Sequence, residues 1–503
     1  MSPRRSWIPG SLVLVAVCVS AAAGLAQDAA RKPVIEREES WQVIEMLGQR
    51  VGYGRSEVAP IDEDGRSIVK SDSEVHMLFK RFGQKIAITV LIGTRETPEG
   101  DVLSFEYVTQ NPPAAPSRIA GVVDGGELTL TTTVDGKAKT ATRAWKPEWK
   151  SPAYQDRVLR EQPLKAGDQR SFEAYLPEFA KAARIDLKAG AVETIKLLEG
   201  PDQSLQKVTV RNSLLPGIPM DMWLDDKGRA LKTSTSLLGT DMITYTVSKT
   251  EALKSLDGEE LDFAVGTLVK VQAIPDAYTL GEVVYKISLP SPEAVEALPD
   301  SLNQHKKPLA GNVVELRVTR ERLPATAAIK SAAAEFTGPT KFLQSDDDEV
   351  RKHARAAVGD ATDPVEKCRR MEKYVAETLK NKNFSTAMAS AGEVARTLEG
   401  DCTEHAVLLA AMLRAEGIPS RVAVGLVYVA SDPNFGGHMW TEACLDGEWH
   451  ALDGTLGRGG TTAVHLKLGD SSLAEEGLSQ SELFVPLVTI LGKLQIEVVS
   501  VKE

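Results

Sequence analysis

The sequence predicts an α+β protein in which a β-rich antiparallel region precedes a C-terminal unit of a helix packed on an antiparallel sheet. Polar and apolar residues alternate repeatedly in the first half, for example over Glu127–Val134, which ends at an Asp-Gly turn signal. Helical patterns begin only near Phe342, and Ala406–Leu413 is apolar all round, as in a buried helix. Two further strand patterns joined by a short turn follow that helix.

The bulk composition is that of an ordinary globular protein. The chain has 503 residues, of which 42% are hydrophobic and 26% charged, and its formal net charge is −11. At roughly 100–200 residues per domain, this length predicts two to four domains. The chain lacks a basic stretch interleaved with aromatic residues, so nucleic acid is not an expected partner.

Changes in pattern along the chain predict three domains after a leader. We expect a β-rich antiparallel N-terminal domain over 28–255 and a small β-domain or linker module over 265–330. The domain that carries the chemistry is expected over 340–503, because helices replace strands near its beginning. Each boundary lies where the alternating pattern stops or changes period.

The N-terminus has the features of a signal peptide. Arg4 and Arg5 precede an apolar core over Leu12–Ala23, and small residues stand before a cut at Gln27. We therefore expect residues 1–26 to be removed and the protein to be periplasmic or secreted. The alternative is an uncleaved membrane anchor. No later apolar run reaches membrane length, so no stable membrane span is expected in the mature protein.

The cysteine count requires an explanation in an oxidising compartment. Cys18 would leave with the signal peptide, and Cys368, Cys402 and Cys444 would remain. Because three is an odd number, at least one thiol has no partner within the chain. We expect Cys368 and Cys444 to be unpaired structural thiols.

Cys402 has the position of a nucleophile. Asp401 and Glu404 form a capping-box pattern, which places Cys402 at the first position of the buried helix. There the helix dipole and unpaired backbone N–H groups are expected to lower the pKa of the thiol. Taken alone, Cys402 is more typical of a small buried hydrophobic residue than of a nucleophile. The residues that follow it in the chain favour the nucleophile.

A hairpin is predicted to bring a histidine and an aspartate together. One strand runs from His438 to Leu445, and a two-residue Asp-Gly turn joins it to a strand that ends at Leu452. The register that this turn dictates places Trp440 opposite Asp453. His438 then lies on the same face as Asp453 and diagonal to it, so the carboxylate reaches the imidazole. With Cys402, this pair makes a nucleophile, base and orienting group.

Four sequence blocks carry a resemblance to a known family. They are Gly400–Ala406, Ala415–Arg421, His438–Glu442 and Trp449–Thr455. In this order and spacing the blocks resemble the bacterial transglutaminase-like superfamily, and the resemblance covers roughly Val350–Thr462. The chain departs from the usual Asp-Pro-Thr only in having glycine after the aspartate, which should change only that turn. The N-terminal 300 or so residues are not covered.

The resemblance implies a papain-like cysteine fold and a definite chemistry. The catalytic Cys, His and Asp of the family fall on Cys402, His438 and Asp453. The implied reaction is acyl transfer at an amide bond through a Cys thioester, with no organic cofactor and no metal. The calcium dependence of animal transglutaminases is not expected, because no matching acidic residues are identifiable.

Three functions are compatible with these residues. The first is a thiol hydrolase, whether protease, amidase or deamidase, and the second is a cross-linking transglutaminase. The third is a non-catalytic binding or structural protein of the cell envelope that keeps only the fold. The intact triad argues against the third, and hydrolysis is weakly favoured over cross-linking. The expected partner is a protein or peptide amide, including those of the cell wall.

The other histidines and one tryptophan receive lesser roles. His405 belongs to the family pattern and is expected to be a structural hydrogen-bonding residue rather than a second base. Trp440 shares the face of the predicted pair and either walls the site or belongs to the core. His450 is expected to point to the opposite face, and His353 and His465 carry no functional signal.

Overall fold

The computed structural model describes residues 36–503, apart from 64, 82, 238, 257–259, 263–267, 384–387 and 475–479. The predicted signal peptide over 1–26 and the start of the predicted 28–255 domain therefore lie outside the described residues. The described chain forms two compact units. One contains Asp262–Glu503 together with Arg81–Gln84, and the other contains Lys85–Leu261 and the chain up to Lys80.

The N-terminal unit is built on a single 14-stranded sheet. Its strands are β1 (Glu38–Met46), β2 (Gln49–Glu63), β3 (Arg66–Arg81), β4 (Gln84–Glu96), β5 (Val102–Gln110), β6 (Ser117–Asp124), β7 (Glu127–Val134), β8 (Lys137–Ala144), β9 (Gln169–Leu176), β10 (Lys181–Ile195), β11 (Gln203–Asn212), β12 (Met220–Leu224), β13 (Ala230–Leu237) and β14 (Thr240–Val247). The order β8 to β1 followed by β14 to β9 joins two antiparallel meanders where β1 pairs with β14. Short helices α1 (Tyr154–Glu161), η1 (Pro177–Phe179) and α2 (Lys249–Ala252) complete the unit.

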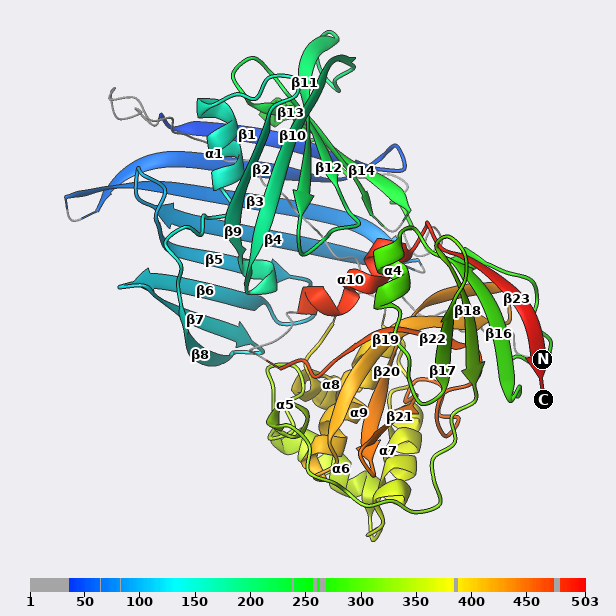
Figure 1. The fold of residues 1–503 in the computed structure, drawn as a ribbon. Coiled ribbons are helices and arrows are strands. Elements are labelled where there is room, and N and C mark those ends of the chain that lie inside the picture. The colour runs from blue at the N-terminus through cyan, green and yellow to red at the C-terminus, as the bar shows by residue number, and fades with distance from the viewer. Residues whose placement is uncertain are drawn as a thin grey trace. The chain divides into compact units, whose positions relative to one another are not determined.

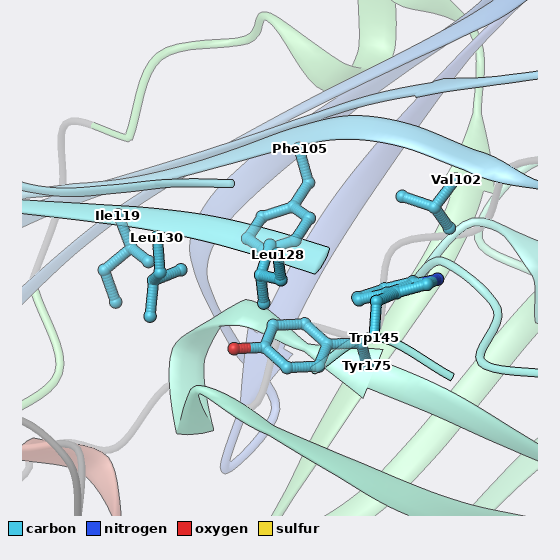
Figure 2. Packing of buried hydrophobic residues seen from close by; sticks show 7 residues of the cluster. All are labelled: Val102, Phe105, Ile119, Leu128, Leu130, Trp145 and Tyr175. Carbon is cyan, nitrogen blue, oxygen red and sulfur yellow. The ribbon is translucent and has the colours of Figure 1, made fainter. Parts of the chain in front are cut away.

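Alternation of side chains gives this sheet its core. Along β3 and β4, buried residues alternate with less buried ones, as the period of two in a strand requires. Figure 2 shows one cluster, in which the rings of Phe105 and Tyr175 have centroids 5.1 Å apart. Gly121 is required beside it, because a Cβ there would lie 2.1 Å from the Phe105 ring. The cluster joins β5 to β9, so the sheet curls back on itself.

The C-terminal unit combines helices with a buried sheet (Figure 1). Its helices are α4 (Pro292–Ala297), α5 (Ala334–Thr337), α6 (Asp348–Val358), α7 (Pro364–Thr378), α8 (Ala391–Thr397), α9 (Cys402–Ala415) and α10 (Gln480–Ile490). Its first sheet has the order β15-β20-β19-β22, with β21 also paired to β20. These strands are β15 (Val269–Lys270), β19 (Ser420–Val429), β20 (Asn434–Leu445), β21 (Glu448–Leu452) and β22 (His465–Ser471). A helix on an antiparallel sheet is what the sequence predicts, and the α+β class is confirmed.

A second, four-stranded sheet lies in the same unit. Its order is β17-β18-β16-β23, and its strands are β16 (Glu282–Ser288), β17 (Gln304–Pro308), β18 (Val313–Thr319) and β23 (Gln495–Lys502). The strands of the predicted 265–330 module therefore pair with a strand from the end of the chain. Tyr285 of β16 is fully buried, and its hydroxyl donates to the Ala463 carbonyl at 2.9 Å.

Helix α9 packs directly on the first sheet. Its residues from Cys402 to Arg414 are all buried, and it contacts both β19 and β20. The Thr441 hydroxyl of β20 donates to the Ala406 carbonyl at 2.9 Å, which fixes the helix along that strand. The beginning of α9 is therefore held in place beside β20. Within the described residues, no helix combines the length and the apolar character needed to cross a membrane.

Candidate active site

The beginning of α9 has the predicted capping box. The Asp401 carboxylate accepts from the Thr403 N–H at 2.8 Å, and the Glu404 carboxylate accepts from the Asp401 N–H at 2.9 Å. These bonds satisfy backbone donors that a helix end otherwise leaves open. Cys402 is the first helical residue, as predicted, and it is only 2% exposed.

The hairpin has the predicted register and brings the predicted pair together. Leu445 faces Glu448 and Thr441 faces Leu452, so Asp453 emerges just beyond the end of the ladder. The His438 Nε2 atom lies 2.9 Å from Asp453 Oδ2, and both side chains are fully buried. The diagonal contact predicted from the turn alone is therefore present.

The thiol of Cys402 lies against the edge of β20. On one side β20 pairs with β15 at positions 434–435 and with β21 at 441–445. Among the described residues, 436–440 has no strand partner on that side. The Met439 N–H lies in this gap and hydrogen bonds to the Cys402 sulfur. Because Met439 directly follows His438, the thiol lies beside the position of the predicted base.

Burial dominates the electrostatics of the thiol. It raises the pKa of Cys402 well above its usual value, and the Asp401 and Glu404 carboxyls act in the same direction. The Met439 N–H and the Arg81 guanidinium lower the pKa. The lowered pKa that the sequence predicts from the helix end and a neighbouring His438 is therefore wrong for this structure. The helix end is buried, and desolvation of the thiolate outweighs the dipole.

The tautomer of His438 follows from its partner. An ionised carboxylate only accepts hydrogen bonds, so the proton shared with Asp453 belongs to His438 Nε2. In the neutral ring Nδ1 then carries a lone pair. This atom is buried, and no hydrogen-bond partner for it exists among the described residues. The ring therefore presents a buried basic nitrogen that the protein leaves available.

Asp453 is held by more contacts than its partner alone. Its Oδ1 atom accepts from the Thr455 N–H at 2.8 Å and from the Leu456 N–H at 3.2 Å. Its own N–H donates to the Glu372 carboxylate of α7 at 2.9 Å, and the Gly460 N–H donates to the same oxygen at 2.9 Å. Backbone and side chain of Asp453 are thus fixed from opposite directions.

The two carboxyl groups have opposite pKa shifts. Burial acts to raise the pKa of Asp453, but the charge and hydrogen bond of His438 and the hydrogen bond of His465 outweigh it. The pKa of Asp453 therefore lies well below its usual value. Burial raises the pKa of Glu372 to about 7, although the Gly460 and Asp453 N–H groups oppose the rise. Asp453 is the permanent anion of the site.

His405 has the structural role that its position predicts. Its Nδ1 atom donates to the Asp401 carbonyl at 2.5 Å, one turn back along α9. Its Nε2 atom lies 2.9 Å from the Lys382 ammonium, which donates to it. Burial, followed by the charge of Lys382, lowers the pKa of His405 to about 4, so it stays neutral. Burial also lowers the pKa of Lys382 to about 8.

Three residues that contact the site were not identified from the sequence. His465 lies with Nε2 at 3.1 Å from Asp453 Oδ2, although its sequence context carries no signal. Glu372 supports the Asp453 backbone, and Arg81, about 320 positions before the thiol, forms a buried ion pair with Asp401. His465 lies 12 positions after Asp453, whereas Glu372 lies 81 positions before it and Arg81 lies 320 positions before Asp401. For these three residues the only available sequence signal was Glu372, an acidic residue at a position of α7 that faces the core.

The remaining polar groups that the sequence highlighted have structural partners. His450 bonds to Glu321 at 3.0 Å, and Glu442 accepts from Lys467 at 2.7 Å. Cys368 and Cys444 are buried free thiols, as expected. Trp440 is 3% exposed and packs with alanines, while its ring lies 6.1 Å from that of His438. It belongs to the core that backs the pair.

Comparison with known proteins finds a family whose model matches part of this chain. Residues 351–454 match the family model of the transglutaminase-like superfamily. The match includes both the Cys402 helix and the hairpin that ends at Asp453. A search of curated proteins finds no match to the chain.

Similar solved structures cover different parts of the chain. A proposed cysteine protease from Cytophaga hutchinsonii has 17% identity and a TM-score of 0.28, covering 44% of this chain and 89% of its own. A β-barrel-like protein of a domain of unknown function from Brucella abortus has 10% identity and a TM-score of 0.32, covering 42% and 96%. A proposed protease from Parabacteroides distasonis has 14% identity and a TM-score of 0.20, covering 74% and 68%. At these TM-scores the likeness carries no functional argument.

Proposed function

We propose that the chain is an exported thiol enzyme that transfers acyl groups at amide bonds, a proposal supported by the match of residues 351–454 to the transglutaminase-like superfamily. Cys402 is the nucleophile, His438 the base and Asp453 the group that orients the base. The observation that carries the proposal is the buried His438 pair. Its Nε2 is bonded to Asp453 at 2.9 Å, and its Nδ1 has no partner among the described residues.

The first step is proton transfer from the thiol to His438 Nδ1. Burial keeps the pKa of Cys402 high, so the resting thiol is protonated and the base must act as the substrate is attacked. The ring becomes an imidazolium ion beside a fully buried carboxylate. Asp453 stabilises that charge and prevents the ring from turning.

Acyl transfer then proceeds through a thioester. The Cys402 sulfur bonds to the amide carbon, and the carbonyl oxygen becomes an oxyanion. When the tetrahedral intermediate collapses, the C–N bond breaks and His438 returns its proton to the leaving ammonia or amine. A water molecule then attacks the thioester in hydrolysis, or a second amine attacks it in cross-linking. His438 takes a proton from either nucleophile and returns it to the sulfur.

Backbone donors near the thiol suit the oxyanion. The beginning of α9 supplies the Cys402 N–H, which a helix leaves without an intrahelical acceptor. The Met439 N–H lies against the sulfur and favours the thiolate. Both donors belong to rigid, buried elements, so neither needs to reorganise during the reaction.

Export and substrate class rest on the sequence. Arg4, Arg5 and the apolar core over Leu12–Ala23 support a cleaved signal peptide and a periplasmic or secreted location. In that location the available amides belong to proteins, peptides and the cell wall. We therefore propose a protein or peptide substrate, with hydrolysis favoured over cross-linking.

Product analysis tests this function directly. The full chain is incubated with a glutamine-containing peptide and with a cell-wall peptide, with and without a primary amine, and products are identified by mass spectrometry. Hydrolysis gives cleaved or deamidated peptide, and cross-linking gives an amine adduct with loss of ammonia. Either product should disappear in Cys402→Ala. Products that persist in Cys402→Ala, or no product above that control on any substrate, would overturn the enzyme proposal.

A further inference from the structure

Both carboxylate oxygens of Asp453 accept hydrogen bonds from donors that the fold holds in place. Oδ1 accepts from the Thr455 and Leu456 backbone N–H groups. Oδ2 lies 2.9 Å from His438 Nε2 and 3.1 Å from His465 Nε2. The second histidine is 3% exposed and stands at the beginning of β22, so it is held by a strand rather than by a loop. One carboxylate oxygen therefore has two imidazole partners.

Thr462 fixes which nitrogen of His465 carries the proton. The Thr462 backbone N–H donates to His465 Nδ1 at 3.1 Å, and the Thr462 hydroxyl lies 3.0 Å from the same atom. A backbone N–H only donates, so Nδ1 must hold a lone pair, and the proton is on Nε2. A second ring proton would point at the Thr462 N–H. His465 is thus a neutral ring that donates to Asp453.

We propose that His465 is a positioning residue that fixes the Asp453 carboxylate for His438 and keeps it ionised. This inference rests on the proposed function, because it assigns His465 a part in the same site. His465 touches neither the thiol nor a substrate in this role. It holds Oδ2 in line with His438, which keeps the His438 ring oriented toward Cys402. The geometry makes a chain of four groups rather than three.

The same atoms invite a metal interpretation, which the hydrogen bonds disfavour. The ligand atoms of His438, Asp453 and His465 all lie within 4.8 Å of one another. A histidine that binds a metal through Nε2 carries its proton on Nδ1 and donates it to an acceptor. Here His465 Nδ1 faces the Thr462 N–H, which is a donor. The donor set fits a hydrogen-bonded carboxylate.

The charge of Asp453 depends on every titratable group around it. Those groups are His438 of β20, His465 of β22, Glu372 of α7, and Tyr278, Lys382 and His405 from neighbouring segments. Among the described residues, the side chains that donate hydrogen bonds to the carboxylate are those of His438 and His465. Removing the His465 donor leaves Oδ2 with one partner and shifts ionisation of Asp453 to higher pH.

Two substitutions separate the hydrogen bond from the ring. His465→Phe keeps a planar ring without a donor, and His465→Gln keeps an amide N–H near the Nε2 position. We expect His465→Phe to lower kcat about 10- to 100-fold with KM nearly unchanged, as for the loss of one charge-assisted bond. In the dependence of kcat on pH, the fall on the acid side should move to higher pH. His465→Gln should recover most of the rate. His353→Phe, which also removes a hydrogen-bonded histidine but lies outside the site, serves as control.

Two measurements do not depend on activity. Proton NMR of the full chain should show downfield imidazole N–H signals from His438 and His465 beside that of the His450–Glu321 pair, and the first two should disappear in Asp453→Ala. In His465→Phe one of these two signals should remain. Titration with Zn²⁺ tests the metal interpretation. Unchanged kcat and an unchanged fall on the acid side in His465→Phe, fewer than two downfield signals that depend on Asp453 in the wild type, or stoichiometric zinc binding lost in His465→Phe would each overturn the proposal. An inactive wild type that keeps both signals would overturn only the proposed function.

Discussion

Strands β3 and β20 bury their side chains in different ways. In β3 of the N-terminal sheet, buried residues alternate with less buried ones, so most polar groups face outward and need no protein partner, with Ser71, Ser73 and Arg81 as buried exceptions. In β20 of the C-terminal unit every residue is buried. Polar groups on β20 therefore either find a partner inside the protein or cost free energy. A polar residue in β20 therefore indicates an internal partner or a chemical role. In most of β3 a polar residue indicates only a side chain that faces outward.

The partners found in β20 separate structure from chemistry. Thr441 bonds to the Ala406 carbonyl, and Glu442 accepts from Lys467. In His438 one nitrogen is paired, and the other, like Asn434 Oδ1 and Trp440 Nε1 of the same strand, has no partner among the described residues. Leaving a buried acceptor open is costly unless a reacting group uses it. Of these three atoms, His438 Nδ1 belongs to the ring that is paired with a carboxylate, and it is the one for which we propose a role in the chemistry.

Removing the nucleophile should give the largest effect. Cys402→Ala is expected to abolish acyl transfer, with a loss of about 10⁴-fold or more, because no other thiol can replace it. Its circular dichroism spectrum should be unchanged. Cys444→Ser is the matched control from β20, since its side chain lies near the far end of the strand, and it should keep its rate within about threefold. A large loss in Cys444→Ser would break the contrast between structural and reactive groups.

Asp453→Asn should give the next largest effect. The amide would direct an N–H₂ group at one of two imidazole donors, so His438 must change tautomer or turn. We expect kcat to fall about 10³-fold or more, with little change in KM. Steady-state kinetics on the substrate found by product analysis measures this loss. Near wild-type kcat would show that Asp453 is only a structural acid.

A buried acid in α7 should make stability depend on pH. The folded-state pKa of Glu372 is about 7, above its ordinary value of 4.5, so the folded state binds this proton more tightly than the unfolded state does. The wild type should therefore lose stability from this group as pH rises from about 4.5 to about 7, and no further above it. The loss is roughly 3 kcal/mol at 1.36 kcal/mol per pKa unit.

Glu372→Gln isolates that contribution. Its carbonyl oxygen can still accept from the Asp453 and Gly460 N–H groups, but it has no charge to gain. Urea denaturation of both proteins at pH 5 and pH 8 should show that the wild type loses more stability between these values than the variant. Parallel losses in the two proteins would show that Glu372 ionises normally.

Replacing Arg81 should have a smaller effect, because its guanidinium acts on the Cys402 pKa through charge alone. The Asp401 carboxylate raises the pKa of Cys402 and the Arg81 guanidinium lowers it. Arg81→Met should therefore slow alkylation of Cys402 near neutral pH by about 10-fold, the equivalent of one pKa unit. Adding Asp401→Asn should restore the rate, because asparagine still caps the helix without the charge. A double variant as slow as Arg81→Met would contradict this account.

The predictable part of the site was local in sequence. The capping residues around Cys402 and the two-residue turn before Glu448 each fix geometry within a few positions, and both arrangements are present. The pairing of His438 with Asp453 followed from the register of that one hairpin. Alternation likewise predicted the strands of the N-terminal sheet.

The part that could not be predicted depends on contacts between distant segments. His465 reaches Asp453 only because β22 pairs with β19 on the far side from the hairpin. The order that joins β1 to β14 and the pairing of β23 with β16 are long-range choices of the same kind. The thiol pKa was misjudged for a related reason, since burial of the helix end is set by packing rather than by the helix itself.

The most direct test of the central claim is the pH dependence of Cys402 alkylation by iodoacetamide in wild type and His438→Ala. Peptide mapping by mass spectrometry separates Cys402 from Cys368 and Cys444. If His438 is the base, the wild-type profile should lie at lower pH than that of His438→Ala, in which burial raises the pKa of Cys402 and no imidazole opposes the rise. Identical profiles at Cys402 in the two proteins would contradict the account.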